Sequence, residues 1–194
     1  MGLTVESTAD REVKIGSVSL DSPYALAPMA GMTDTAFRRL VKRRGGCGLV
    51  VTEMVSSEGL VRGIDRTLEY AEYTEEERPV SIQIFGGDPV TMAEAAKIVE
   101  GMGADIIDVG GESTRPGGAN PVTVEEELMR VIPVVQALSE LPVPISLDTR
   151  HARVMTEGVA AGAALINDIN AYKFAPCSQH LLRYFTWSSI SYTL

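Results

Sequence analysis

The feature that most constrains the fold is a repeated alternation of short apolar runs with longer segments of helical period. Each run is apolar almost throughout, which is typical of strands that are covered on both faces of a sheet. Strands that alternate with helices predict successive βα units around a parallel sheet. Six strands are expected on this basis: Tyr24–Ala27, Gly48–Thr52, Val80–Ile84, Asp105–Val109, Pro144–Asp148 and Ala164–Asp168.

Capping residues mark where the intervening helices begin. Asp88 followed by Pro89 predicts an N-cap and a first helical residue, with the helix continuing through Glu100. Thr123 and Glu126 have the spacing of a capping box at the start of another helix. That helix is expected to pack through Leu128, Val131, Ile132, Val135 and Leu138, and further helices are expected over residues 34–44 and 151–161, with a helix or long loop over residues 58–78.

The number of units predicts the fold class. A closed (β/α)8 barrel of the TIM type has eight strands and about 250 residues, with about 200 near the lower limit. This chain has 194 residues and six expected strands, followed by an unassigned tail at residues 172–194 that shows no clear period. We therefore expect a single barrel-like α/β domain over residues 1–194, truncated to about six βα units. The unpaired edges of such a sheet favour self-association, so a homo-oligomer is expected.

Composition and charge narrow the function classes. Hydrophobic residues make up 45% of the chain, enough for one sizeable core without disulfides. The formal charge of −9 argues against a chain that binds nucleic acid through its own net charge. The basic cluster at residues 38–44 is expected to be a solvated helix face. No run reaches the roughly 18 apolar residues of a membrane span, so no membrane association is expected. The two cysteines, far apart in sequence, make the cytoplasm the expected compartment.

Cysteine and histidine spacing gives no site. Cys47 and Cys177 lie far apart, without CxxC or Cys/His spacing, so neither a zinc site nor a disulfide framework is predicted. His151 and His180 have no serine or cysteine at the spacing of a nucleophilic motif. We therefore predict no metal site and assign no catalytic residue.

Three upstream segments carry a resemblance to a known family. They are Ala27-Pro28-Met29-Ala30-Gly31-Met32-Thr33-Asp34, Thr52-Glu53-Met54 and Ser81-Ile82-Gln83-Ile84-Phe85-Gly86. Residues 15–109 resemble a tRNA-dihydrouridine synthase, which implies a barrel that binds FMN at the carboxyl ends of its strands and acts on tRNA. The resemblance implies that Pro28, Met29 and Ala30 lie against the flavin ring and that Gln83 forms hydrogen bonds with it.

One motif of that family is missing here. The family continues after its fourth strand with Asn-x-Gly-Cys-Pro, whose cysteine protonates the substrate, whereas this chain has Gly110-Gly111-Glu112-Ser113. Cys47 precedes the second strand and is expected to be a small packed residue rather than a displaced acid. An FMN-dependent oxidoreductase that lacks its catalytic cysteine is therefore the alternative function.

Downstream segments resemble a different family of barrels. Residues 103–117 read Gly-Ala-Asp-Ile-Ile-Asp-Val-Gly-Gly-Glu-Ser-Thr-Arg-Pro-Gly, and Pro144–Thr149 and Ile166–Ile169 follow. Residues 103–171 resemble a dihydropteroate synthase, which implies condensation of hydroxymethyl-dihydropterin diphosphate with p-aminobenzoate in folate biosynthesis. The resemblance assigns pterin contacts to Asp148 and Asn167, and diphosphate contacts to Thr114 and Arg115.

The residue types suit that substrate. A carboxylate accepts two of the ring N–H groups, an amide pairs with donors and acceptors alike, and an arginine fork matches a diphosphate. The alternative interpretation makes Asp148 and Asn167 strand-end caps for the following helices. Glu112 is expected to hold its loop by accepting backbone N–H groups.

Three functions are consistent with these segments. The first is a pterin-binding transferase of the dihydropteroate synthase type, which requires no cofactor apart from an optional Mg²⁺. The second is the FMN-dependent enzyme, and the third is an inactive hybrid fragment of the two families.

Overall fold

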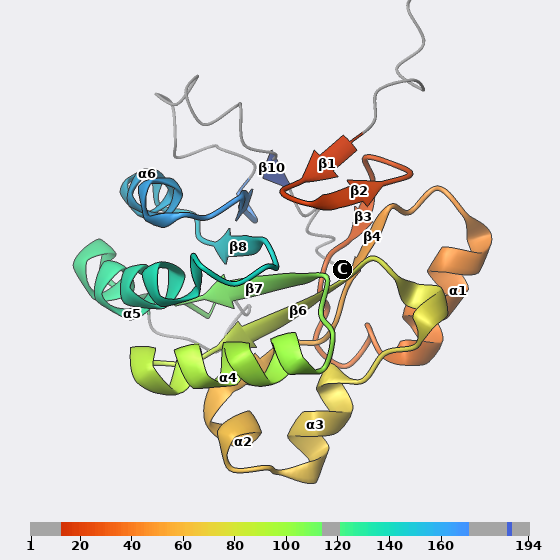
Figure 1. Cartoon of the computed structure of the whole chain (residues 1–194), viewed down its shortest axis with the longest axis horizontal. Coiled ribbons are helices and arrows are strands. Elements are labelled where there is room, and N and C mark those ends of the chain that lie inside the picture. Colours follow the sequence, from red (N-terminus) through yellow and green to blue (C-terminus); the bar gives the residue numbers. More distant parts are fainter. Residues whose placement is uncertain (1–12, 114–120, 171–185, 188–194) are drawn as a thin grey trace, which may run out of the picture.

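The computed structural model describes residues 13–113, 121–170 and 186–187. Its centre is a parallel sheet whose strands, apart from the short β5, pair in the order in which they follow along the chain (Figure 1). The order is β3-β4-β6-β7-β8-β9-β10, and the short β5 pairs with β6. The bounds are β3 Ala25–Leu26, β4 Leu49–Val51, β5 Val55–Ser56, β6 Val80–Phe85, β7 Ile106–Gly110, β8 Ile145–Asp148, β9 Leu165–Asn167 and β10 Thr186–Trp187.

This strand order is that of a (β/α)8 barrel, in which parallel neighbours follow one another in sequence. Among the described residues, β3 and β10 lie at the two edges of the sheet and do not pair with each other, so the barrel is open. The truncated TIM-type barrel expected from the sequence is therefore confirmed, as are all six expected strands. The short strand β10 lies within residues 172–194, the tail for which the sequence predicts no element.

Helices cover the outer face of the sheet (Figure 1). Side chains at alternate positions of β6, β7 and β8 form the core with helix residues, among them Ile82, Val109, Leu147, Met92 and Val135. Asp34, Asp88 and Thr123 each accept a backbone N–H group at a helix start, as expected. The helices are α1 Thr35–Arg44, α2 Ser57–Val61, α3 Asp65–Ala71, η2 Glu75–Glu77 (a 3-10 turn), α4 Pro89–Gly101, α5 Val124–Leu138 and α6 Ala152–Ala161.

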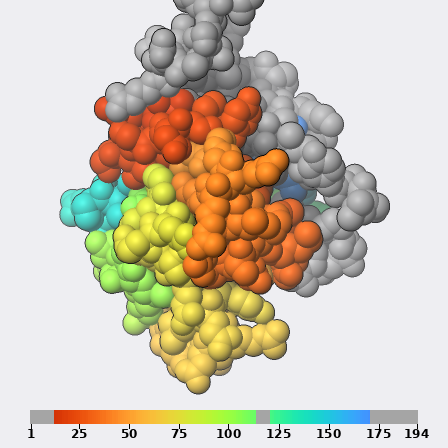
Figure 2. Space-filling view, turned by 90° about the vertical axis from the view of Figure 1, so that its right-hand side faces the viewer, coloured from red at the N-terminus to blue at the C-terminus, as the bar shows by residue number. Residues whose placement is uncertain are grey.

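A β-hairpin that the sequence did not predict covers the amino end of the sheet. Its strands are β1 Val13–Ile15 and β2 Val18–Leu20, and they pair antiparallel. The hairpin forms a second apolar cluster with Leu49, Ile106 and Leu165, which begin β4, β7 and β9. Figure 2 shows the hairpin in red above the orange segment that contains α1. The amino end is thus closed, which leaves the carboxyl end for a site.

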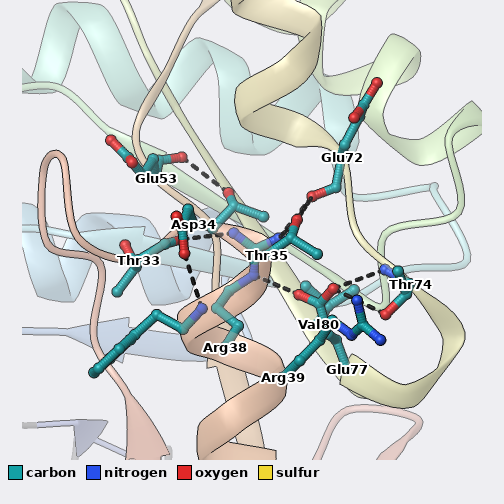
Figure 3. A network of polar contacts seen from close by, with 12 residues as sticks. Thr33, Asp34, Thr35, Arg38, Arg39, Glu53, Glu72, Thr74, Glu77 and Val80 are labelled. Atoms are coloured by element: carbon teal, nitrogen blue, oxygen red, sulfur yellow. Dashed lines mark hydrogen bonds and ion pairs between the residues drawn. The ribbon is translucent and has the colours of Figure 1, made fainter.

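A buried ion pair attaches α1 to the segment before β6 (Figure 3). Arg38 is 1% exposed, and its Nε donates to the Glu77 carboxylate at 2.6 Å. The same guanidinium donates to the carbonyl oxygens of Thr33 and Glu72. The expected solvated face at residues 38–44 is therefore wrong for Arg38, because this side chain turns inward to meet Glu77.

The rest of the basic cluster is largely neutralised. Arg39 and Arg43 both form ion pairs with Glu76, and Lys42 donates to the carbonyl oxygens of Cys47 and Gly48. No described helix is long and apolar enough to cross a membrane.

Candidate functional site

A cleft of about 840 Å³ lies at the carboxyl ends of the strands. This is the end at which barrels of this type place their sites, because the βα loops converge there. The cleft brings together residues from both resemblances: Pro28, Met29, Ala30 and Gln83 from the flavin set, and Asp148 and Asn167 from the pterin set. Its other polar lining includes Ser56, Ser57, Glu58, Asp88, Thr91, Glu112, Ser113 and Arg130.

Strand register explains how the polar groups meet. Gln83, Asp108 and Ser146 are paired neighbours on β6, β7 and β8. Asp148 and Asn167 are paired neighbours on β8 and β9, one layer closer to the cleft. Side chains at these positions share the inner face, since alternate residues of a strand point to the same side.

A single amide connects the two carboxylates at the base of the cleft. The Nε2 of Gln83 lies 2.6 Å from Oδ2 of Asp148 and 3.0 Å from Oδ2 of Asp108. Asn167 donates its Nδ2 to the same oxygen of Asp108 at 3.0 Å. The other oxygen of Asp108 and the hydroxyl of Ser146 are buried without a hydrogen-bond partner among the described residues. One carboxylate oxygen and one hydroxyl beneath the cleft can therefore still form hydrogen bonds.

Loss of contact with water raises the pKa values of both carboxyl groups. Desolvation raises the pKa of Asp108, and the neighbouring hydroxyl of Ser146 and the amides of Asn167 and Gln83 oppose this rise. The pKa of Asp148 is raised further, first by desolvation and then by the negative charge of Asp108. A ligand that donates N–H groups would favour the ionised form of Asp148, because it supplies the donors that burial has removed.

Residues on the flavin side of the cleft have a different character. Pro28, Met29 and Ala30 follow β3, and a hydrogen bond from Thr33 N–H to the Met29 carbonyl at 3.1 Å closes their turn. They offer a small apolar wall. Gln83 does not stand free beside that wall, because its amide nitrogen is engaged by the two carboxylates.

The segment that follows β7 contains no cysteine. Gly110, Gly111, Glu112 and Ser113 line the cleft at this place. Cys47 lies elsewhere, half-buried, with its Sγ 3.1 Å from the carbonyl oxygen of Leu49, and burial raises the pKa of its thiol. These observations are consistent with a packed residue and leave the flavin constellation without its acid.

Glu112 is anchored rather than free. Arg150 donates to both of its carboxylate oxygens at 2.8 Å, and the backbone N–H group of Val122 donates to one of them. The fork of Arg150 lowers the pKa of Glu112, with the Val122 bond acting in the same direction. Glu112 therefore holds its loop. The prediction named backbone donors alone, whereas the main partner in the structure is the side chain of Arg150.

The cleft is acidic where the structure describes it. Glu58, Asp88, Glu112 and Asp148 line it, and Arg130 is the one cationic side chain among the described lining residues. Arg130 is itself bonded to the Gly111 carbonyl and to Glu126. Thr114 and Arg115, the residues predicted to contact a diphosphate, lie outside the described residues, as do Cys177 and His180.

Sequence reasoning missed two residues of this site. Asp108 was quoted inside the downstream motif but was not assigned, although an aspartate in the middle of an apolar strand signals a buried polar role. Arg150 gave no signal, because its pairing with Glu112 spans 38 residues.

The fold and the cleft define an α/β barrel with a polar site at its carboxyl end. The pterin binding enzyme family matches residues 80–188, and the dihydrouridine synthase (Dus) family matches residues 25–110. Because the first match covers more than half of the chain, the chain belongs to the pterin binding enzyme family. The two matches overlap over residues 80–110, which contain β6, α4 and β7.

Individual relatives come from both kinds of enzyme. A dihydropteroate synthase of Synechocystis is 48% identical over 93 residues, covering 47% of this chain and 32% of the relative. A probable tRNA-dihydrouridine synthase of Rhodobacter capsulatus is 37% identical over 173 residues, covering 79% of this chain and 52% of the relative. A solved dihydropteroate synthase of Burkholderia cenocepacia is 47% identical with a TM-score of 0.42, covering 50% of this chain and 35% of that one. The chain spans about a third to a half of the length of these relatives.

Proposed function

We propose that the cleft binds the pterin ring of hydroxymethyl-dihydropterin diphosphate, and that the reaction it serves is condensation with p-aminobenzoate. The observation that carries the proposal is the pairing of Asp148 with Asn167 at adjacent strand ends, above the buried Asp108. A carboxylate beside an amide matches the row of donors and acceptors along a pterin edge. The family match at residues 80–188 supports the same class of ligand.

In this proposal each polar residue has one task. Asp148 accepts ring N–H groups as a carboxylate, and Asn167 pairs with the neighbouring ring atoms. Gln83 donates to Asp148 and so favours the ionised state that the ligand needs. Because burial raises the pKa of Asp148, pterin affinity is expected to increase as pH rises through that pKa.

A thermal-shift experiment on the full chain tests the proposal. A ligand present at about 100 times its dissociation constant stabilises the folded state by about 2.7 kcal/mol. We expect hydroxymethyl-dihydropterin diphosphate to raise the melting temperature of the wild type and of Asp21→Asn, a matched change at an exposed aspartate outside the cleft lining. The rise should be absent in Asp148→Asn, and an equal rise in that variant would refute the assignment.

Flavin binding is the second candidate, because Pro28, Met29, Ala30 and Gln83 line the same cleft. The apolar wall suits one face of the FMN ring, but the acidic lining has no unengaged described cation to hold its phosphate. Stabilisation by FMN that is lost in Gln83→Met would favour this candidate over the pterin. A folded protein that responds to neither ligand would favour the inactive hybrid.

A further inference from the structure

A cluster of potential metal ligands lies beside the cleft and is unused by the pterin proposal. It consists of Glu112, which follows β7, Glu127 on α5, and His151, the N-cap residue of α6. One ligand atom from each residue lies within 4.8 Å of the others. The three residues are distant in sequence and are brought together by the packing of α5 and α6 at the carboxyl end of the sheet.

Glu127 gives the independent sign that something is missing from this cluster. Its side chain is 0% exposed, and its Oε1 has no hydrogen-bond partner among the described residues. The other oxygen is 2.6 Å from Nδ1 of His151. An unsatisfied buried carboxylate oxygen costs free energy, so native structures rarely keep one without a water, an ion or a functional reason.

The backbone is shaped to bring Glu127 to this position. A Cβ built on Gly111 would lie 2.5 Å from Cγ1 of Val131 and 3.2 Å from Cγ of Glu127. Only glycine therefore lets α5 approach the end of β7 this closely. The carbonyl group of Gly111 also accepts from Arg130, which fixes the same turn of the helix.

From this geometry we propose that Glu112, Glu127 and His151 form a site for a divalent metal ion, with Zn²⁺ as the ion that fits the donor set. One imidazole nitrogen and two carboxylate oxygens suit Zn²⁺, which binds such atoms at about 2.0–2.2 Å, whereas Mg²⁺ prefers oxygen ligands alone. Tetrahedral ligands at that distance lie about 3.3–3.6 Å apart. The His151 Nδ1 to Glu127 Oε2 distance of 2.6 Å must therefore increase for both atoms to bind one ion.

The neighbouring charges are compatible with a cation. Arg150 and the backbone N–H group of Val122 together donate three hydrogen bonds to Glu112. A carboxylate has about four lone-pair positions, so one position on Oε2 remains for an ion. An ion here would lie beside the cleft, since Glu112 also lines it. Its positive charge would offset the acidic lining.

Zinc titration of the full chain tests this proposal without any cleft ligand. The protein is stripped with EDTA, dialysed, and titrated with Zn²⁺ in a calorimeter, and Co²⁺ serves as a visible absorption probe. We expect one equivalent to bind. The affinity for Zn²⁺ should fall in both Glu127→Gln and His151→Asn. Loss of an outer-shell partner typically lowers metal affinity about 10- to 100-fold, and these two losses of a ligand should exceed that range. Asparagine is chosen because it suits the N-cap position.

Glu125→Gln is the matched control, since Glu125 is exposed on the same helix and pairs with Arg153. It should bind Zn²⁺ as the wild type does. Circular dichroism establishes that each variant is folded. Absence of binding to the wild type, or unchanged binding to the folded Glu127→Gln and His151→Asn proteins, would overturn the proposal whatever the pterin experiment gives.

Discussion

Replacing Gln83 with glutamate tests the charge balance beneath the cleft. The amide nitrogen of Gln83 donates to both Asp108 and Asp148, so Gln83→Glu exchanges a shared donor for a buried carboxyl of the same shape beside two others. At low pH the new carboxyl is protonated and can still donate one hydrogen bond. At higher pH it must either remain protonated or place a third negative charge beside two carboxyls whose pKa values are already raised.

The magnitude follows from proton linkage. An unfolded glutamate titrates near pH 4.3, and each pH unit over which only the unfolded chain ionises costs the fold about 1.36 kcal/mol. The variant should therefore lose about 2.7 kcal/mol relative to the wild type between about pH 5 and pH 7. The wild type has the same sign of dependence: the raised pKa values of Asp108 and Asp148 give stability that is complete below their unfolded pKa values and is lost as pH rises through the folded ones.

Urea unfolding at several pH values measures the difference. The control is Gln136→Glu, the same substitution at an exposed position of α5, and its curve should follow the wild type within about 0.5 kcal/mol. If the Gln83→Glu curve also runs parallel to the wild type over this range, the new carboxyl does not share the buried environment of the two aspartates. The account of Gln83 as their common donor would then be wrong.

Two further substitutions address the frame around the site. Arg38→Met leaves Glu77 buried without its ionic partner and should lower the free energy of unfolding in urea by about 3–5 kcal/mol. The double variant that adds Glu77→Gln should recover part of this loss. A single variant as stable as the wild type would contradict the buried pair. Gly111→Ala places a methyl group against Val131 and should cost about 1–3 kcal/mol, read as a lower melting temperature, and an unchanged value would show that α5 moves away freely.

Most of the sheet could be predicted because its signal is local. Each of β4, β6, β7, β8 and β9 is a short, mostly buried run rich in Val, Ile and Leu, so composition alone identifies the strands. Helix starts were equally accessible, since Asp34, Asp88 and Thr123 cap the turn that follows them. The hairpin β1–β2 was missed because its strands have only three residues each and alternate with charged and polar positions.

The site was only partly predictable, because its contacts connect distant residues. The segments around Pro28 and Asp148 were identified by motif, but no motif shows that Gln83 donates across 65 residues to Asp148. Arg38 shows the same limit. Its basic neighbours in sequence predict a solvated face, but its side chain is buried because it pairs with the distant Glu77. The cluster of Glu112, Glu127 and His151 has no metal-binding spacing in sequence, which is why no metal site was predicted.

The pairing of β6 with β7 has a consequence for how such chains arise. Five residue pairs join these strands in register, from Ser81 with Ile106 to Phe85 with Gly110, and both family matches include this region. Parallel strands are held by backbone groups that every non-proline residue carries, so a strand accepts a neighbour of foreign ancestry if its face is apolar and its length matches. A barrel can therefore exchange whole βα units at a strand that both parent sequences share. What does not transfer is the agreement among side chains at the carboxyl end, which must be established again after each exchange.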